Sequence, residues 1–255
     1  MVFVNDSLNH LDLAFVVDTT GSMSGLIAAA QQQMIAMIDE LARAAAVDMR
    51  LGVIEYRDHP PQDQMVYHVH GFTGSLRQAQ ATIHSLAASG GGDGPEAVLD
   101  GVLAACHDLR WRPHARRLAV LVGDAPPHGV GAGGDGFPRG CPCGETIESV
   151  SAAAERARVT LYALGLNGTV VNSFGRLSRT TGGEFFPASH GDAALARLKD
   201  ILASEFGNLE FDRRVLVERQ SVPETSVTDL AAQLATTRRA VAAAISRLER
   251  RELVV

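Results

Sequence analysis

Lysine, cysteine and long apolar runs are scarce in this sequence of 255 residues. Lys199 is the single lysine among 23 basic residues, so the chain contains no Gly-Lys-Ser or Gly-Lys-Thr phosphate-binding loop. Three cysteines are too few for a disulfide framework. No apolar run approaches the roughly 20 residues that span a bilayer, and the first residues lack the pattern of a signal peptide. We therefore expect a cytoplasmic protein without a membrane segment, and the excess of arginine and alanine indicates a GC-rich bacterial genome.

Charge and apolar content are those of an ordinary globular protein. The formal net charge is −6, and 46% of the residues are hydrophobic, which is enough to bury a sizeable core. The negative charge argues against nucleic-acid binding by the chain as a whole. Residues 211–255 differ from the rest, because they hold eight arginines against six acidic residues and are net positive.

Strand and helix patterns alternate along most of the chain. Apolar and alternating runs predict strands at residues 11–17, 49–56, 65–70, 117–123, 159–165 and 184–187. Helical spacing predicts helices at 23–45, at 75–86, from Pro95 onward, and at 145–157, 169–181 and 191–206. The segment 125–144 is rich in glycine and proline and predicts a long loop. This order indicates an α/β fold with a doubly wound, mostly parallel sheet and helices on both faces.

Three aspartates from distant parts of the sequence are expected at one edge of that sheet. Asp18 and Asp124 each end an apolar strand, and Asp93 lies in a glycine-rich loop before a helix. Ligands of such sheets bind beyond the carboxyl ends of the strands, near the point where the strand order reverses. Thr20 and Ser22 follow Asp18 at alternate positions, so three oxygens fall within one turn of backbone. Such oxygen ligands suit Mg²⁺, and the sequence predicts a metal site at this rim.

The same motifs resemble those of the von Willebrand factor type A (VWA) family. The metal-ion-dependent adhesion site (MIDAS) of that family combines Asp-x-Ser-x-Ser with a distant threonine and a distant aspartate. Asp18, Thr20 and Ser22 match the first element, with threonine in place of the first serine. Asp124 matches the last element, and Asp93 stands where the family has threonine. The resemblance implies that these five residues hold the metal.

The resemblance covers roughly residues 8–207 and leaves 208–255 as a separate segment. It implies a Rossmann-like fold that binds Mg²⁺ or Mn²⁺ and mediates protein–protein contact without catalysis, often with an acidic side chain of the partner on the metal. The additional carboxylate of Asp93 is expected to strengthen metal binding and to leave less positive charge for an acidic partner. The motifs at 56–59 and 90–96 are most similar to those of microbial members and of members attached to alpha-kinases.

Other interpretations of the first motif remain open. Asp18, Ser22 or Ser24 could instead cap a helix. An enzyme is less favoured, because Met23 stands where a nucleophile elbow has its serine. Thr20 likewise stands where a phosphatase with a nucleophilic strand-end aspartate needs a second aspartate. We therefore expect no catalytic residues.

The long loop offers ligands for a second metal. His128, Cys141 and Cys143 could bind Zn²⁺, with Asp135, His59 or another chain supplying the fourth ligand. The alternative is that the two thiols are reduced, partly exposed and free of metal.

The positively charged tail has the pattern of two short helices. Ser226 and Asp229 predict a capped helix that ends at about Leu234, and a second helix is expected over 237–251. The pattern resembles a truncated winged helix-turn-helix, in which the second helix enters the major groove. That resemblance implies DNA contacts by Thr237, Arg238, Arg239, Ala242, Ala243 and Ser246. The alternative function is thus a transcriptional regulator or DNA-associated adaptor, whereas the alternative for the tail is a helical module for dimerisation or docking.

Overall fold

A computed structural model describes residues 7–44, 46–92, 94–221 and 225–253. Six strands form one sheet in the order β3-β2-β1-β4-β5-β6. Their bounds are β1 His10–Asp18, β2 Asp48–Tyr56, β3 Tyr67–Thr73, β4 Arg116–Gly123, β5 Thr160–Gly165 and β6 Phe185–Pro187. All neighbouring strands are parallel except β2 and β3, which are antiparallel. The predicted doubly wound α/β fold is confirmed, and the strand order reverses between β1 and β4.

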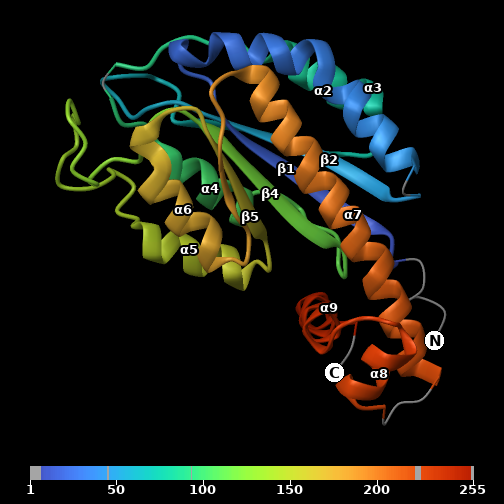
Figure 1. The fold of residues 1–255 in the computed structure, drawn as a ribbon. Coiled ribbons are helices and arrows are strands. Elements are labelled where there is room, and N and C mark those ends of the chain that lie inside the picture. Colours follow the sequence, from blue (N-terminus) through green and yellow to red (C-terminus); the bar gives the residue numbers. More distant parts are fainter. Residues whose placement is uncertain (1–6, 45, 93, 222–224, 254–255) are drawn as a thin grey trace.

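The central strands are apolar because helices cover both of their faces. In β1, Leu13 and Phe15 pack on one face, whereas Ala14 and Val16 pack on the other, as the two-residue period of a strand requires. The first face is covered by α2 (Ser24–Ala44), α3 (Leu76–Ser85) and α7 (Gly191–Ser221). The second face is covered by α4 (Val98–His107), α5 (Ile147–Arg156) and α6 (Val171–Thr180) (Figure 1).

Loops gather beyond the carboxyl ends of the parallel strands. The segment predicted as a loop, 125–144, contains no helix and makes only an isolated β-bridge, between Pro127 and Glu96. It projects from the end of the sheet in Figure 1. Two short 3-10 turns, η1 (Gly21–Met23) and η2 (Gly168–Val170), lead into α2 and α6 at the same end.

Helix α7 is one continuous helix of 31 residues. The prediction that it ends at Phe206 is wrong, since it continues to Ser221. Its first half packs on the sheet through Phe206, and its second half buries Leu216 among the tail helices. Because each half packs against a different part of the protein, the helix does not break where the composition changes. The predicted division between residues 207 and 208 therefore falls inside this helix. Like the other described helices, α7 lacks the long apolar stretch that crossing a membrane requires.

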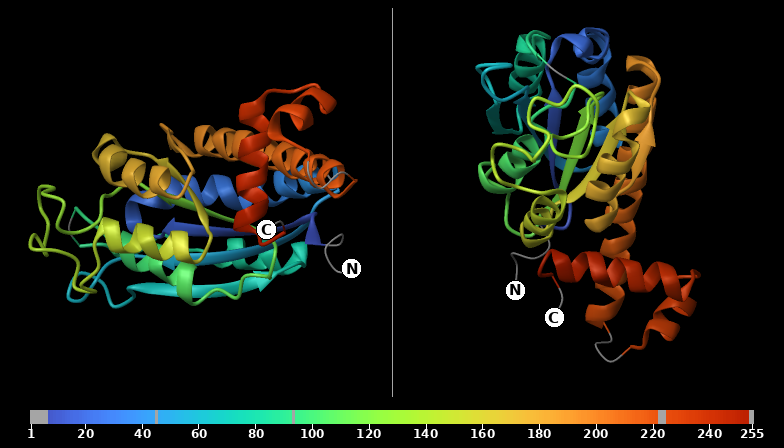
Figure 2. Two further views of the ribbon diagram at one scale, coloured as in Figure 1. Left: turned by 90° about the horizontal axis from the view of Figure 1, so that it is seen from below. Right: turned by 90° about the vertical axis from the view of Figure 1, so that its left-hand side faces the viewer.

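The tail forms the two predicted helices, α8 (Val227–Gln233) and α9 (Arg238–Arg250). Both lie at the end of the molecule opposite the 125–144 loop (Figures 1 and 2). Arg251, directly after α9, fixes this position. Its guanidinium donates hydrogen bonds to three backbone carbonyls at the amino-terminal ends of β1 and β4, those of Ser7, Leu8 and His114. The tail is thus docked on the body of the protein.

Candidate metal centre

Asp18 ends β1 beside the point where the strand order reverses. The residue is 0% exposed. Its Oδ1 accepts two hydrogen bonds from Thr20, one from the backbone N–H at 2.8 Å and one from the hydroxyl at 2.6 Å. The turn after β1 therefore folds the Thr20 side chain back onto the aspartate, as the spacing of the motif predicted.

Two hydroxyl groups lie between the carboxylates of Asp18 and Asp124. Thr20 Oγ1 lies 3.4 Å from Ser22 Oγ, and the Ser22 hydroxyl donates to Asp124 Oδ1 at 3.0 Å. Asp124 directly follows β4, the neighbour of β1. Four of the five predicted ligands are thus brought together at one rim. The fifth, Asp93, lies outside the described residues.

Helix capping does not account for Asp18 or Ser22. The Asp18 carboxylate bonds to Thr20 only two residues away, and the Ser22 hydroxyl bonds to Asp124 rather than to a helix backbone. Gly21 stands between them, and its N–H donates to the carbonyl oxygen of Gly90 at 3.3 Å. This contact holds the glycine-rich loop that precedes α4 against the turn that follows β1.

Asp18 is a buried carboxyl group whose charge is incompletely compensated. Burial raises its pKa to about 7; the hydrogen bonds from Thr20 oppose the rise, and the charge of Asp124 adds to it. Its Oδ2 has no hydrogen-bond partner among the described residues. Burying such a charge is costly, so a cation next to Oδ2 would stabilise the ionised form. Carboxylate and hydroxyl oxygens are the donors that Mg²⁺ and Mn²⁺ prefer, and the residues present fit such an ion.

Tyr56 forms the floor beneath this cluster. Its side chain is fully buried at the end of β2, and in the described part of the chain its hydroxyl finds no hydrogen-bond partner. Burial, followed by the charges of Asp18, Glu96 and Asp124, raises its pKa well above the usual value, so the phenol stays neutral. Gly123 makes room for the ring, since a Cβ there would overlap the hydroxyl. The sequence singled out the motif at 56–59, but it assigned no role to the ring of Tyr56, because a tyrosine in a strand pattern indicates only core.

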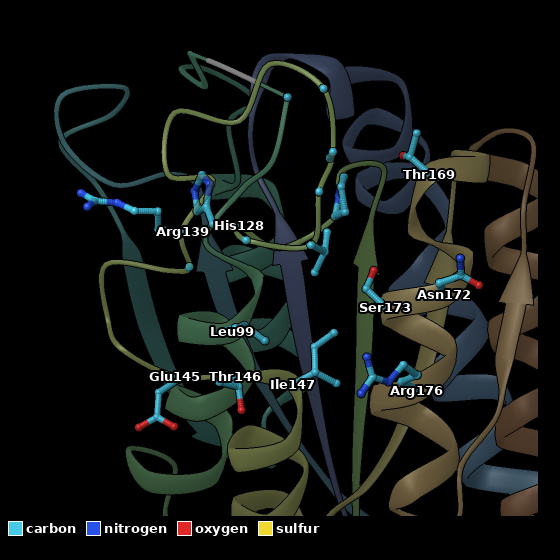
Figure 3. A pocket seen from close by; sticks show the side chains of 18 of the residues that line it. Leu99, His128, Arg139, Glu145, Thr146, Ile147, Thr169, Asn172, Ser173 and Arg176 are labelled. Carbon is cyan, nitrogen blue, oxygen red and sulfur yellow. The ribbon is translucent and has the colours of Figure 1, made fainter.

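A hollow of about 800 Å³ opens beside Asp124 (Figure 3). The 125–144 loop, the start of α5 and the region of η2 and α6 line it. Its polar side chains carry both signs of charge and include Arg139, Glu145, Thr146, Thr169, Asn172 and Arg176. This size lies within the range of pockets that bind ligands, so the rim offers recognition surface next to the candidate metal ligands.

His128 is not placed as a zinc ligand. Its Nδ1 lies 2.9 Å from Asp135 Oδ1, and its Nε2 lies 2.7 Å from Asp58 Oδ1, so both ring nitrogens are engaged. Burial disfavours its charged form, but hydrogen bonds and charge from the two aspartates outweigh burial and raise the pKa of His128. This arrangement does not match the possibility that His128 binds Zn²⁺ together with the two cysteines, because Asp58 and Asp135 occupy its ring nitrogens and Cys141 lies beside His59 and Asp100 instead.

The tail residues expected to contact DNA are exposed. Thr237, Arg238, Arg239 and Ser246 all face solvent on or just before α9. Thr237 caps this helix, because its hydroxyl accepts a hydrogen bond from the N–H of Ala240 at 3.1 Å. Solvent exposure is expected for the outer face of any docked helix, so contact with DNA stays a prediction.

Known proteins share part of this sequence. Residues 12–114 match the model of the von Willebrand factor A domain. The chain is 29% identical over 143 residues to the alpha-protein kinase vwkA of Dictyostelium discoideum. The aligned segment covers 55% of this chain and 23% of the kinase. It is 33% identical over 137 residues to a putative ariadne-like RING finger protein of Acanthamoeba polyphaga mimivirus. This second aligned segment covers 52% of this chain and 13% of the viral protein. The chain thus matches less than a quarter of either relative's length.

Solved structures share the fold at low sequence identity. Proximal thread matrix protein 1 from the mussel byssus, with zinc in its MIDAS, aligns with a TM-score of 0.56 at 14% identity over 78% of this chain and 46% of its own. The pilus adhesin SpaC of Lactobacillus rhamnosus aligns with a TM-score of 0.58 at 15% identity over 79% of this chain and 30% of its own. The match over residues 12–114 and the shared fold together support a von Willebrand factor A domain in this chain.

Proposed function

We propose that this chain is a non-catalytic protein-interaction module whose contact with its partner depends on a divalent cation, Mg²⁺ or Mn²⁺. The observation that carries the proposal is the buried carboxyl group of Asp18. One of its oxygens has no partner within the described residues, and the oxygen atoms of three other side chains lie close by, those of Thr20, Ser22 and Asp124.

The side chains at the rim offer the cation two kinds of oxygen ligand. Asp18 and Asp124 supply negative charge, whereas Thr20 and Ser22 supply neutral hydroxyls. When bound, the cation offers an open coordination position to an oxygen-bearing group of the partner. Asp93 is the proposed fifth ligand, and its carboxylate would lower the net positive charge of the site. We therefore expect tight metal binding together with a reduced preference for acidic partners.

A binding role is favoured over catalysis because the hydroxyls at the rim are committed to the cluster. The Thr20 hydroxyl donates to Asp18, and the Ser22 hydroxyl donates to Asp124. In the described part of the chain, neither hydroxyl is hydrogen-bonded to a histidine or lysine that could take its proton. A nucleophile without such a base is weak.

The hollow beside Asp124 supplies the proposed recognition surface around the metal. Its lining from the 125–144 loop, α5 and α6 presents both arginine and glutamate side chains, which suits a polar segment of a protein. The relatives support a modular role, because the matched segment forms a small part of proteins named as a kinase and a RING finger protein. A structural neighbour is named as a pilus adhesin.

Affinity capture tests the proposal. The wild-type chain of 255 residues and its Asp18→Ala variant are immobilised and exposed to an extract of the source cells, with Mg²⁺ or with a chelator. The proposal predicts a protein that wild type recovers in Mg²⁺, with a roughly tenfold or greater loss on chelation or in Asp18→Ala. The matched control is Asp200→Ala, which removes an exposed aspartate of α7 and should capture like wild type. A protein captured equally by Asp18→Ala and in chelator contradicts metal-dependent binding.

A further inference from the structure

Two cysteines of the 125–144 loop lie beside a histidine and an aspartate from other parts of the chain. His59 Nε2 lies 3.0 Å from Asp100 Oδ2 and 3.1 Å from Cys141 Sγ. Cys141 Sγ lies 3.1 Å from the same oxygen of Asp100. Cys143 Sγ is 2.9 Å from Cys141 Sγ, and both cysteines are free. The ligand atoms of His59, Asp100 and Cys141 lie within 4.8 Å of one another, and all three residues are buried. The half-buried Cys143 adjoins this group through Cys141.

Thiols make up half of this cluster, and they are weak hydrogen-bonding groups. The imidazole of His59 is the strong partner of the Asp100 carboxylate, which is only 8% exposed, and the same nitrogen also contacts the Cys141 thiol. Hydrogen bonding therefore accounts for the pairing of His59 with Asp100, but it gives little reason for two thiols in direct contact beside them. A divalent cation with an affinity for sulfur would bind all of these groups together.

The donor set and its dimensions match those of zinc. Zn²⁺ takes four ligands in a tetrahedron and uses thiolate sulfur, imidazole nitrogen and carboxylate oxygen. With metal–ligand distances of about 2.0–2.3 Å, the ligand atoms of a tetrahedron lie about 3.3–3.8 Å apart. The observed separations of 2.9–3.1 Å would have to widen by less than about 1 Å, which side-chain adjustment can supply.

We propose that His59, Asp100, Cys141 and Cys143 bind one Zn²⁺ ion, in a site separate from the cation at the rim. This inference does not depend on the proposed function, because no ligand is shared between the two sites. The site has its full complement of four protein ligands, which is the arrangement of a structural zinc site rather than a catalytic one.

The fold explains why these four residues meet. His59 follows β2, Asp100 lies in the first turn of α4, and the cysteines belong to the long loop. The backbone N–H of Gly144 donates to the carbonyl of Cys141 at 2.9 Å, and this turn directs both thiols toward one point. A half-buried Cys143 leaves a route by which the ion can enter.

Zinc at this site would fasten the 125–144 loop to the body of the protein. The loop contains no helix and no extended strand to hold it. Phe137 adds an apolar contact, since its ring packs edge-on against His59 at 5.9 Å and against His128 at 4.9 Å between centroids. A metal that closes a long loop limits the freedom of the chain. The same loop lines the hollow beside Asp124, so the ion would set the shape of the recognition surface.

Zinc content of variants of the full chain tests the site. Each protein is washed with a weak chelator, and its bound zinc is measured by mass spectrometry. We expect about one zinc ion per chain in wild type and almost none in Cys141→Ser/Cys143→Ser. Cys106→Ser is the matched control, because Cys106 is a free, buried cysteine of α4 whose thiol donates to the Val102 carbonyl instead. Asp18→Ala should also keep its zinc.

A second measurement uses wild type alone and so does not depend on how the cysteine variant folds. Zinc X-ray absorption should show about two sulfur ligands at about 2.3 Å together with nitrogen or oxygen at about 2.0–2.1 Å. Absence of zinc from wild type, a zinc shell without sulfur, or a Cys141–Cys143 disulfide in freshly purified protein would each overturn the proposal. Zinc lost from Asp18→Ala but kept by the cysteine variant would also overturn it, and would place the zinc at the rim instead.

Discussion

Asp18 illustrates how one buried side chain can define a site. Thr20 satisfies one carboxylate oxygen, whereas the other has no partner among the described residues. The burial that raises its pKa to about 7 is the same penalty that a bound cation would remove. The neighbouring groups provide oxygen rather than positive charge. We interpret the cluster as a metal site in which a bound cation would compensate the buried charge of Asp18.

Gly123 offers a test at the residue scale of how tightly the floor of this site is packed. A Cβ at this position would overlap the Tyr56 hydroxyl and approach Phe174 Cζ to 3.3 Å. We expect Gly123→Ala to lower the free energy of unfolding by about 1–3 kcal/mol through overpacking. Gly207→Ala is the matched control, since a Cβ there meets open space in α7, and it should stabilise by about 0.5–1 kcal/mol. Denaturant titration measures both, and equal effects would show that Tyr56 is not tightly confined.

Residues close in sequence, or at the ends of apolar strands, were predictable. Asp18, Thr20 and Ser22 follow from local spacing, and Asp124 follows from its place after β4. The zinc cluster was only partly predictable, because its spacing does not resemble a motif. His59 and Asp100 are 41 positions apart, and His59 and Cys141 are 82 apart. Only the packing of α4 and the long loop against the end of β2 brings them together.

At the scale of elements, a buried ion pair connects the sheet to α7. Arg116 of β4 donates to Glu205 of α7 through Nε at 2.7 Å and Nη2 at 3.0 Å. The Tyr162 hydroxyl of β5 donates to the same carboxylate. Burial alone would raise the pKa of Glu205, but the charge and hydrogen bonds of Arg116 outweigh burial and hold the pKa below its usual value.

This ion pair should make stability depend on pH. Because the pKa of Glu205 is lower in the folded chain than its ordinary value of 4.5, ionised Glu205 stabilises the fold above about pH 4.5. That stabilisation is lost as the pH falls through the lower, folded-state pKa. We expect Glu205→Gln to cost about 3–5 kcal/mol at pH 7, because it leaves the Arg116 charge buried without its partner. The difference from wild type should shrink in acid.

The control for this prediction is Glu210→Gln, an exposed position on the same helix. It should change the free energy of unfolding by less than about 0.5 kcal/mol. Denaturant unfolding of the three proteins between pH 7 and pH 3 gives the measurement. A difference between wild type and Glu205→Gln that stays constant over this range would contradict the linkage.

Whether a segment forms a helix or a strand was predictable along most of the chain. The length of one helix and the direction of one strand were not. Strands β1 and β4 follow from their apolar runs. The antiparallel direction of β3 does not, because its half-exposed residues fit either direction of an edge strand. The length of α7 depends on two separate packing surfaces, and only the first of these produces a clear pattern in the sequence. Tertiary contact decides such boundaries.

At the scale of the whole molecule, the two candidate metal sites and the tail occupy opposite ends. The rim lies beyond the carboxyl ends of the strands, and α8 and α9 lie at the amino-terminal end (Figure 2). Docking through Arg251 is what the structure shows for the tail, and neither the fold nor the relatives favour a regulator that reads DNA. Partner binding at the rim and any role of the tail are therefore separable by single substitutions at either end.

The dependence of thermal stability on Mg²⁺ tests the central claim most directly. The wild-type chain and its Asp18→Ala and Asp200→Ala variants are treated with a weak chelator and unfolded by heat at increasing Mg²⁺ concentrations. At about 100 times the Kd, binding should stabilise wild type by about 2.7 kcal/mol, which raises Tm by about 5–10 °C in a chain of this size. We predict this rise for wild type and Asp200→Ala and no rise for Asp18→Ala. Equal rises in wild type and Asp18→Ala, or none in wild type, would contradict a cation held by Asp18.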